Sequence, residues 1–373
     1  MNGPFTMRLS TILKKPPAWL ADFGDSEDVV IASIAEYKRN LEEAPFPGWA
    51  DEKQRQDVFL KIRGAVEKLA CFGKGHFAEM PSCTLDARRL LTEWQMLTPT
   101  LAARQEGCGF ALSRDRGAAV FINDEEHLAV RAYEHGMQID KAAGNAHRIL
   151  EELSGSLSFA RDERLGYLMS SPACAGAGFR LSVLLHLPGL TIADMIAPVM
   201  NSAESLSISI RPVYREENGA AGHLYEVSSV SPFDEKESEI TDRMARVVST
   251  LAERELSVRC KFVESHFYDI LDPVERSVGT LHYAVRLGWR ETMTALSFIR
   301  MGTFFDMINW SAGNRKQAVL SLPALSHTIS SSFLNLHRDP NLQETDNVDV
   351  LRSFRVRKLL YPAIPFGVTL DEP

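Results

Sequence analysis

The chain has 373 residues, and this length predicts about two domains, each large enough to bury its own core. Hydrophobic residues make up 45% of the sequence and charged residues 24%, which excludes disordered and fibrous classes. The formal net charge of −8 argues against a protein whose affinity rests on the phosphate backbones of DNA or RNA.

Cysteines and apolar runs set further bounds. The five cysteines are scattered and show no metal-ligand spacing, so we expect neither a disulfide framework nor a zinc site. The sequence has no signal-peptide core and no run near the roughly 20 apolar residues that a membrane helix needs. We therefore expect a cytoplasmic protein without a membrane partner. The cysteines are Cys71, Cys83, Cys108, Cys174 and Cys260.

The first part of the chain predicts strands with helices packed on them. From Asp51 to Ala70, apolar residues recur at three- and four-residue spacing, which is typical of an amphipathic helix. In chain order, the predicted elements are a strand at 28–40, a proline-containing loop at 42–49, helices at 51–70 and 84–97, strands at 118–123 and 127–133, a helix at 141–157 and a strand at 179–187.

The second part changes from strands to helices. After Pro188, a helical segment leads to alternating strands at 206–214 and 222–230, joined by a segment at 215–221 that we expect to be a mobile loop. A long helix is predicted from Lys236 to about Cys260, and the remainder is almost wholly helical. The predicted fold class is α+β: a mostly antiparallel sheet flanked by helices over residues 1–262, followed by an all-α domain over 263–373.

Three stretches are candidates for chemistry, and each also has a purely structural interpretation. Residues 123–127, NDEEH, place carboxylates between two strands, as a catalytic cluster or as a solvated loop. In residues 170–185, backbone amides near Gly176 and Gly178 and the guanidinium of Arg180 can bind an anion, or the segment can be a tight turn. The charged segment 211–217 is a substrate loop or a surface loop.

In this order, the three stretches resemble motifs of the ATP:guanido phosphotransferases, the phosphagen kinases, and within them the bacterial protein arginine kinases. NDEEHLA resembles the family's NEEDHLR, and YLMSSPACAGAGFRLSVLLHLP resembles YLTSCPTNxGTGLRASVxLHLP. RPVYREENGAAGH is similar to RGxYGEGSEALGN. The resemblance covers nearly the whole chain, including a C-terminal region similar to that of the arginine kinases.

The resemblance implies that the γ-phosphoryl group of MgATP is transferred to arginine side chains of proteins. Glu125 is then the catalytic carboxylate that orients the guanidinium and takes up its proton, and Glu216 is the second carboxylate. The resemblance also implies further site residues: Arg180, Arg211 and Arg89 at the nucleotide phosphates, Ser171 and Asn123 at the substrate, and Asp349 and Arg352 in phosphoarginine sensing.

Three positions depart from the family pattern. Ile34, Glu36 and Ala129 stand where the family has arginines that clamp the nucleotide. Charged hydrogen bonds are worth about 1.5–3 kcal/mol each, so three losses would remove about 4–9 kcal/mol from nucleotide binding. Lys38 and Arg131 could supply replacement charges, because residues two apart on a strand face the same side.

Two functions therefore stay open at this point. The first is a protein arginine kinase with a degraded ATP clamp. The second is a pseudokinase that binds arginine or phosphoarginine as a regulatory module. As partners, the resemblance implies protein substrates, a homodimer or other homo-oligomer, an activator protein and the protein quality-control machinery, with no nucleic acid.

Overall fold

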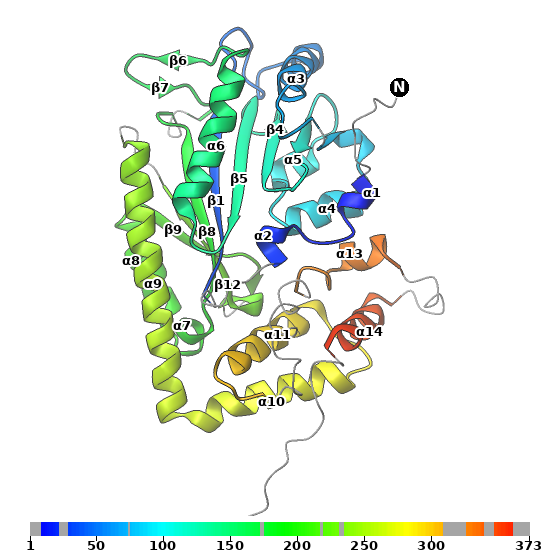
Figure 1. The fold of residues 1–373 in the computed structure, drawn as a ribbon, viewed down its shortest axis with the longest axis vertical. Helices are drawn as coiled ribbons and strands as arrows, with labels where there is room; N and C mark the ends of the chain where they lie inside the picture. Colours follow the sequence, from blue (N-terminus) through cyan, green and yellow to red (C-terminus); the bar gives the residue numbers. More distant parts are fainter. Residues whose placement is uncertain are drawn as a thin grey trace, which may run out of the picture.

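Figure 1 shows a twisted sheet with long helices along one side and a cluster of helices at one end. The structure is a computed structural model, and it describes residues 9–21, 29–73, 75–171, 175–216, 219–230, 235–308, 326–338 and 347–360. No helix within these ranges is long and apolar enough to cross a lipid bilayer.

Helices and strands are mixed through the first two thirds of the chain, and helices follow. The helices are α1 (Leu9–Ile12), α2 (Ala18–Ala21), α3 (Glu52–Val66), α4 (Leu85–Glu93), α5 (Pro99–Ala103), α6 (Ile139–Ser154), α7 (Pro188–Ile192), α8 (Ile196–Glu204), α9 (Glu237–Ser265), α10 (Phe267–Tyr283), α11 (Trp289–Phe304), α13 (Ser331–Leu336) and α14 (Val348–Leu360), with short 3-10 turns η1 (Met80–Ser82) and η3 (Ala221–His223). The strands are β1 (Val30–Arg39), β2 (His76–Glu79), β3 (Gly109–Leu112), β4 (Ala118–Ile122), β5 (Leu128–His135), β6 (Arg161–Asp162), β7 (Gly166–Tyr167), β8 (Phe179–His186), β9 (Ile208–Pro212), β10 (Arg215–Glu216), β11 (Gly219–Ala220) and β12 (Leu224–Ser229).

The main sheet has eight strands in the order β2-β3-β4-β5-β1-β8-β12-β9. Each neighbouring pair is antiparallel. β1 lies at the centre between β5 and β8, so its side chains have neighbours on both sides. The predicted α+β class with a mostly antiparallel sheet is confirmed.

Several element boundaries differ from the sequence prediction. The helix predicted at 51–70 ends at Val66, and the one predicted at 84–97 ends at Glu93. The segment expected to be an irregular mobile loop at 215–221 contains the two-residue strands β10 and β11, paired as a small hairpin. Helix α9 ends at Ser265, so it crosses the domain boundary predicted after residue 262.

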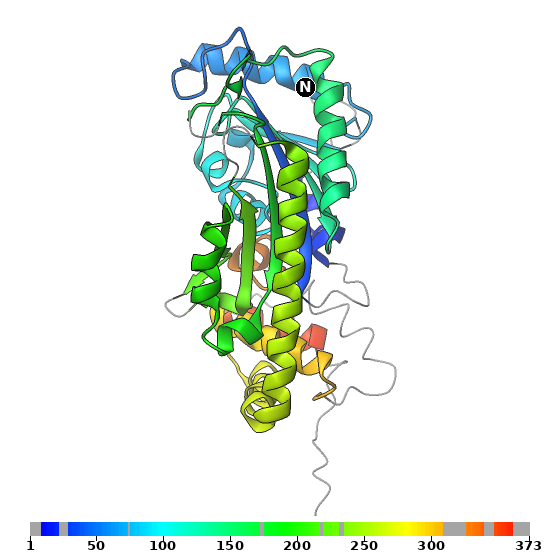
Figure 2. The ribbon, with the colours of Figure 1, turned by 90° about the vertical axis from the view of Figure 1, so that its left-hand side faces the viewer.

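One face of the sheet is mostly apolar and carries two long helices. Tyr37, Val130 and Val183 are among the side chains that this face contributes to a core shared with α6 and α9. α6 has Ala142, Ala146, Ile149 and Leu153 at helical spacing, and each is buried. Figures 1 and 2 show α6 and α9 running along this side of the strands. Burial of each large apolar side chain stabilises the fold by about 1.5–3 kcal/mol.

The opposite face is only partly apolar. A second core, in which Leu90 and Trp94 of the α4 region pack on Ile34 and Tyr133, covers part of it. Along the remaining part, polar and charged side chains of β1, β5, β8 and β12 face outward. The fold thus leaves one polar strip on an otherwise buried sheet.

The C-terminal helices lie at the end of the sheet, around a third core to which Val274, Leu296 and Val356 contribute. The indole nitrogen of Trp94 donates to the carbonyl of His327 at 2.9 Å, which joins the α4 region to the segment before α13. The C-terminal region is therefore packed against the elements that border the polar strip.

Candidate active site

The acidic loop between β4 and β5 gives its carboxylates different environments. Asn123 has a φ of +53°, which turns the chain out of β4. Asp124 is buried and accepts a hydrogen bond from the Thr98 hydroxyl at 2.7 Å, and burial raises the pKa of its carboxyl group. Glu125 differs, because its side chain is 54% exposed.

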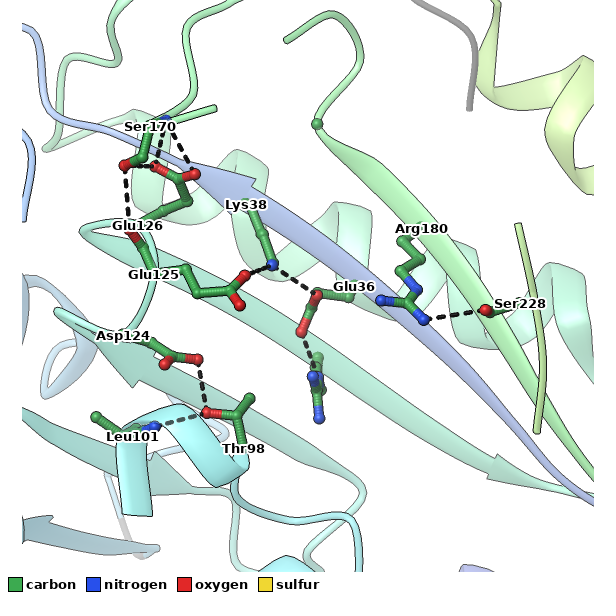
Figure 3. Close-up of polar contacts among 12 residues, drawn as sticks. Glu36, Lys38, Thr98, Leu101, Asp124, Glu125, Glu126, Ser170, Arg180 and Ser228 are labelled. Atoms are coloured by element: carbon green, nitrogen blue, oxygen red, sulfur yellow. Dashed lines mark hydrogen bonds and ion pairs between the residues drawn. The ribbon is translucent and has the colours of Figure 1, made fainter. Parts of the chain in front are cut away.

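Glu126 ties this loop to two other segments. Its carboxylate accepts from the backbone nitrogen of Ser170 at 3.0 Å and from the Ser170 hydroxyl at 2.7 Å. The side-chain amide of Asn40, at the end of β1, donates to it at 2.5 Å. Figure 3 shows Asp124 and Glu126 turned toward their anchors, with Glu125 between them. The acids that flank Glu125 therefore hold the loop, and Glu125 is presented to the solvent.

Asn123 and Ser171 were predicted to contact the substrate. The Asn123 side chain is fully buried, and its amide donates to the carbonyls of Arg55 at 2.8 Å and Gly107 at 2.6 Å. Both amide contacts hold the loop, and the predicted contact of Asn123 with the substrate stays a prediction. Ser171 is exposed next to Ser170, which makes the contacts to the acidic loop.

Lys38 connects the acidic loop to the centre of the sheet. Its ammonium lies 2.5 Å from Glu125 Oε2 and 3.8 Å from Glu36 Oε1. Figure 3 shows the lysine reaching between these two carboxylates. Lys38 was predicted to replace Glu36 as the inward charge. In the structure both face the same side, because they are two residues apart on one strand, so Lys38 does not replace Glu36.

Glu36 stands between two arginines of the neighbouring strands. The strand register places it directly opposite Arg131 of β5 and Arg180 of β8. Arg131 forms an ion pair with Glu36, and Arg180 donates to the Ser228 hydroxyl at 2.9 Å and lies 3.7 Å from Glu226. Carboxylates and guanidinium groups thus alternate across the central strands.

A cleft of about 250 Å³ opens over this row of charges. Its lining combines groups suited to phosphate with groups that repel it: the residues are Ile34, Glu36, Thr92, Gln95, Leu97, Thr98, Pro99, Arg131, Arg180, Ser182 and Glu226. The two guanidinium groups offer fixed donors for anionic oxygens. The two glutamates offset their charge.

Mutual pairing sets the ionisation of these groups. Burial would raise the pKa of Glu36, but Arg131, Lys38 and Arg180 together lower it below its usual range. Burial likewise lowers the pKa of the Lys38 ammonium, and Glu36 and Glu125 raise it by more. Both groups are therefore charged at neutral pH. The cleft holds a fixed carboxylate beside its arginines.

The other predicted nucleotide-binding arginines lie outside the cleft lining. Arg211 on β9 is exposed, lies opposite Glu226 in the strand register, and donates from Nε to the Ser209 hydroxyl at 3.0 Å. Arg211 is thus one strand beyond the cleft on the same face. Arg89 is exposed on α4 and is also outside the lining. The backbone of Glu216 lies in β10, and its side chain lies outside the described part of the structure.

The predicted phosphoarginine-sensing pair has unequal exposure. Arg352 is 1% exposed, and its guanidinium donates to the carbonyls of Ile329 at 2.7 Å and Leu287 at 2.6 Å. It also bonds Asp349 at 2.5 Å, whose side chain is 50% exposed. The arginine therefore holds α14 against its neighbours, and its predicted part in phosphoarginine sensing stays a prediction. Asp349 retains an accessible carboxylate.

Comparison with known proteins decides the family. The family model for the ATP:guanido phosphotransferase C-terminal catalytic domain matches residues 57–258. The chain belongs to the ATP:guanido phosphotransferase family. A second family model, the protein-arginine kinase McsB C-terminal domain, matches residues 268–364. The resemblance inferred from the sequence motifs is thereby confirmed.

Curated members of this family are similar over most of their length. A protein-arginine kinase of Halothermothrix orenii is 28% identical over 290 residues, which are 78% of this chain and 83% of that protein. A protein-arginine kinase of Bacillus cereus is 30% identical over 289 residues, 76% of this chain and 80% of that protein. Each match thus covers about three quarters of this chain and about four fifths of the relative.

Solved structures of guanido kinases share the fold. A crystal structure of lombricine kinase superposes with a TM-score of 0.55 at 19% identity, covering 69% of this chain and 72% of that one. The duplicated taurocyamine kinase of Schistosoma mansoni gives a TM-score of 0.56 at 19% identity, over 69% of this chain and 38% of that one. The chain therefore spans well under half of the duplicated enzyme.

Proposed function

We propose that the chain transfers the γ-phosphoryl group of ATP to arginine side chains of proteins. The observation that carries this proposal is the placement of Glu125: an exposed carboxylate, held by a buried loop, next to a cleft lined by Arg131 and Arg180. A carboxylate suits a guanidinium, and the arginines suit phosphate. The naming of the relatives as protein-arginine kinases supports the choice of protein substrates over free amino acids.

The roles of the residues follow from the chemistry of the transfer. Glu125 orients the guanidinium and accepts its proton as a guanidinium nitrogen bonds to the γ-phosphorus. The bond from the γ-phosphorus to the bridging oxygen breaks, and ADP leaves with the electron pair. Arg180 and Arg131 stabilise the charge on the phosphoryl oxygens. Arg211, one strand further on the same face, adds a third guanidinium. Glu216 is proposed as the second carboxylate.

MgATP is a substrate in this scheme, and the cleft residues fit it in part. Two guanidinium groups face the cleft, and Lys38 stands at its border. Glu36 and Glu226 oppose them. We therefore propose a clamp that holds the nucleotide more weakly than a purely cationic cleft would, with Mg²⁺ arriving on the nucleotide. The relatives' names do not favour the pseudokinase alternative.

Further proposals rest on the family alone. They are a division of labour between residues 1–262 and 263–373, homodimer formation, an activator protein and a link to protein quality control. Sensing of phosphoarginine by the C-terminal part would have to use Asp349 for the guanidinium, because Arg352 is buried.

The experiment is phosphoryl transfer to an arginine-rich protein in the presence of MgATP, detected as acid-labile phosphoarginine by mass spectrometry and phosphorus NMR. We expect the wild type to form phosphoarginine and Glu125→Gln to lose at least about a hundredfold in rate, the size typical of general base removal. Glu67→Gln is the matched control, because it removes an exposed carboxylate that pairs with Arg63. Equal rates for wild type and Glu125→Gln would refute the assigned role.

A further inference from the structure

Lys38 occupies the position at which a substrate cation should meet Glu125. Its ammonium is 2.5 Å from Glu125 Oε2, the atom that faces β1. The lysine side chain is 26% exposed, so it is largely packed between strand and loop. Before any substrate binds, the carboxylate proposed to grip arginine is therefore already paired with a cation of the same chain.

Glu36 is a second carboxylate with which this ammonium can form an ion pair. Arg131 pairs with Glu36 Oε2, whereas Oε1 faces Lys38 at 3.8 Å. A charged hydrogen bond is usually about 2.7–2.9 Å long, so a shift of about 1 Å would place the ammonium on Glu36. Glu36 is fixed by its burial and by Arg131, so its carboxylate keeps its position while Lys38 moves.

We propose that Lys38 is a tethered competitor for the substrate guanidinium at Glu125, and that Glu36 receives the Lys38 ammonium when the substrate binds. This inference rests on the proposed function. Two cations cannot both pair closely with one carboxylate edge without repelling each other. An arriving guanidinium therefore has to displace Lys38. Glu36 reduces the cost of this displacement, because the displaced ammonium still has a carboxylate to pair with.

The arrangement selects arginine over lysine. A guanidinium forms two parallel hydrogen bonds with a carboxylate, which a compact ammonium does not. An incoming arginine gains more at Glu125 than Lys38 loses, whereas an incoming lysine only exchanges one ammonium for another. Glu36, whose charge disfavours phosphate in the cleft, thus acquires a role in substrate specificity.

The test measures peptide affinity by calorimetry without nucleotide, using matched arginine and lysine peptides. Lys38→Met removes the competitor, so the arginine peptide should bind about two- to fivefold tighter, the size expected for a partly exposed ion pair. The lysine peptide should gain by a similar factor, because both cations have to displace the same ammonium. Glu36→Gln removes the second ion-pair partner of Lys38, so it should weaken arginine-peptide binding by a similar factor. In the Lys38→Met background, Glu36→Gln should have no further effect.

Two more variants make the test sharper. Lys38→Arg provides a stronger tethered competitor, and it should weaken arginine-peptide binding relative to wild type even if Glu36→Gln does not fold. Lys141→Met is the control. It removes a lysine that also pairs with a glutamate, Glu134 at 2.8 Å, but lies outside the cleft lining, so it should change neither affinity. Unchanged or weaker arginine-peptide binding by Lys38→Met would overturn the proposal.

These binding data separate the two ideas. Absence of phosphoarginine in the wild-type transfer assay would refute the proposed kinase function. The affinity changes in the Lys38 variants decide the competitor role independently, because they require no nucleotide.

Discussion

Replacing Glu36 by glutamine should have opposite effects on nucleotide affinity and on stability. In the structure the carboxylate lies in the cleft between Arg131 and Arg180. A nucleotide phosphate that approaches these arginines must come close to the Glu36 charge. The neutral glutamine removes this repulsion, but it also removes the buried partner of Arg131.

The magnitudes follow from geometry and burial. Two unit charges about 6 Å apart repel by about 3 kcal/mol at an effective dielectric constant of about 20. Because the cleft is open to solvent, we expect about half of this, a Kd for the nucleotide about tenfold lower. Glu36 and Arg131 have side-chain exposures of 5% and 17%. Breaking such a pair costs about 3–5 kcal/mol, and glutamine keeps an acceptor, so we expect about 3 kcal/mol of lost stability.

The assay pairs calorimetric titration with a non-hydrolysable MgATP analogue and urea unfolding of the same preparations. Glu67→Gln, on the exposed pair with Arg63, is the control and should change neither quantity. If folded Glu36→Gln binds the analogue no tighter than wild type, Glu36 does not oppose phosphate, and the assigned position of the nucleotide is wrong.

Three further predictions concern the surroundings of the site. Glu126→Ala removes the acceptor that ties the loop to Ser170, so kcat should fall at least about tenfold while the peptide Kd changes less, as kinetics and calorimetry will show. Burial, with a contribution from Arg259, lowers the pKa of His223 to about 4. The unfolded chain therefore takes up a proton first as the pH falls from about 6.5 to about 4, and stability should drop by about 3 kcal/mol across this window. Urea unfolding should show a flatter pH dependence for His223→Asn, and an unchanged profile would contradict the assignment. Arg352→Ala leaves two buried carbonyls without their donor and should destabilise the C-terminal helices by about 2–4 kcal/mol, seen as faster proteolysis there; unaltered proteolysis would show that this guanidinium is not a structural tie.

The sequence predicted the fold class and the long elements because their periodicities are strong. The long helix α9 and the strand β8 illustrate this. β2 and β3 were missed, since four residues give too few alternations to reveal a strand. Helix ends were predicted too late, because apolar residues continue in the sequence beyond Val66 and Glu93, where the two helices end.

At the site, motif order singled out Glu125 and Arg180, and the strand register was needed for the rest. From the sequence, Glu36 is a departure from the family pattern. The structure shows that it bridges Arg131 and Lys38. The anchors of the acidic loop, Ser170 among them, come from a segment 44 positions away from Glu126, a distance over which no local pattern gives a signal.

The central claim is that the Glu125 carboxylate binds the guanidinium of a protein arginine. Its most direct test compares an arginine peptide with the same peptide carrying citrulline, which has similar shape but no charge, in wild type and in Glu125→Gln. We predict that wild type prefers arginine by at least about tenfold, the size of one charged hydrogen bond, and that Glu125→Gln loses most of this preference. An equal preference in both proteins would contradict the claim.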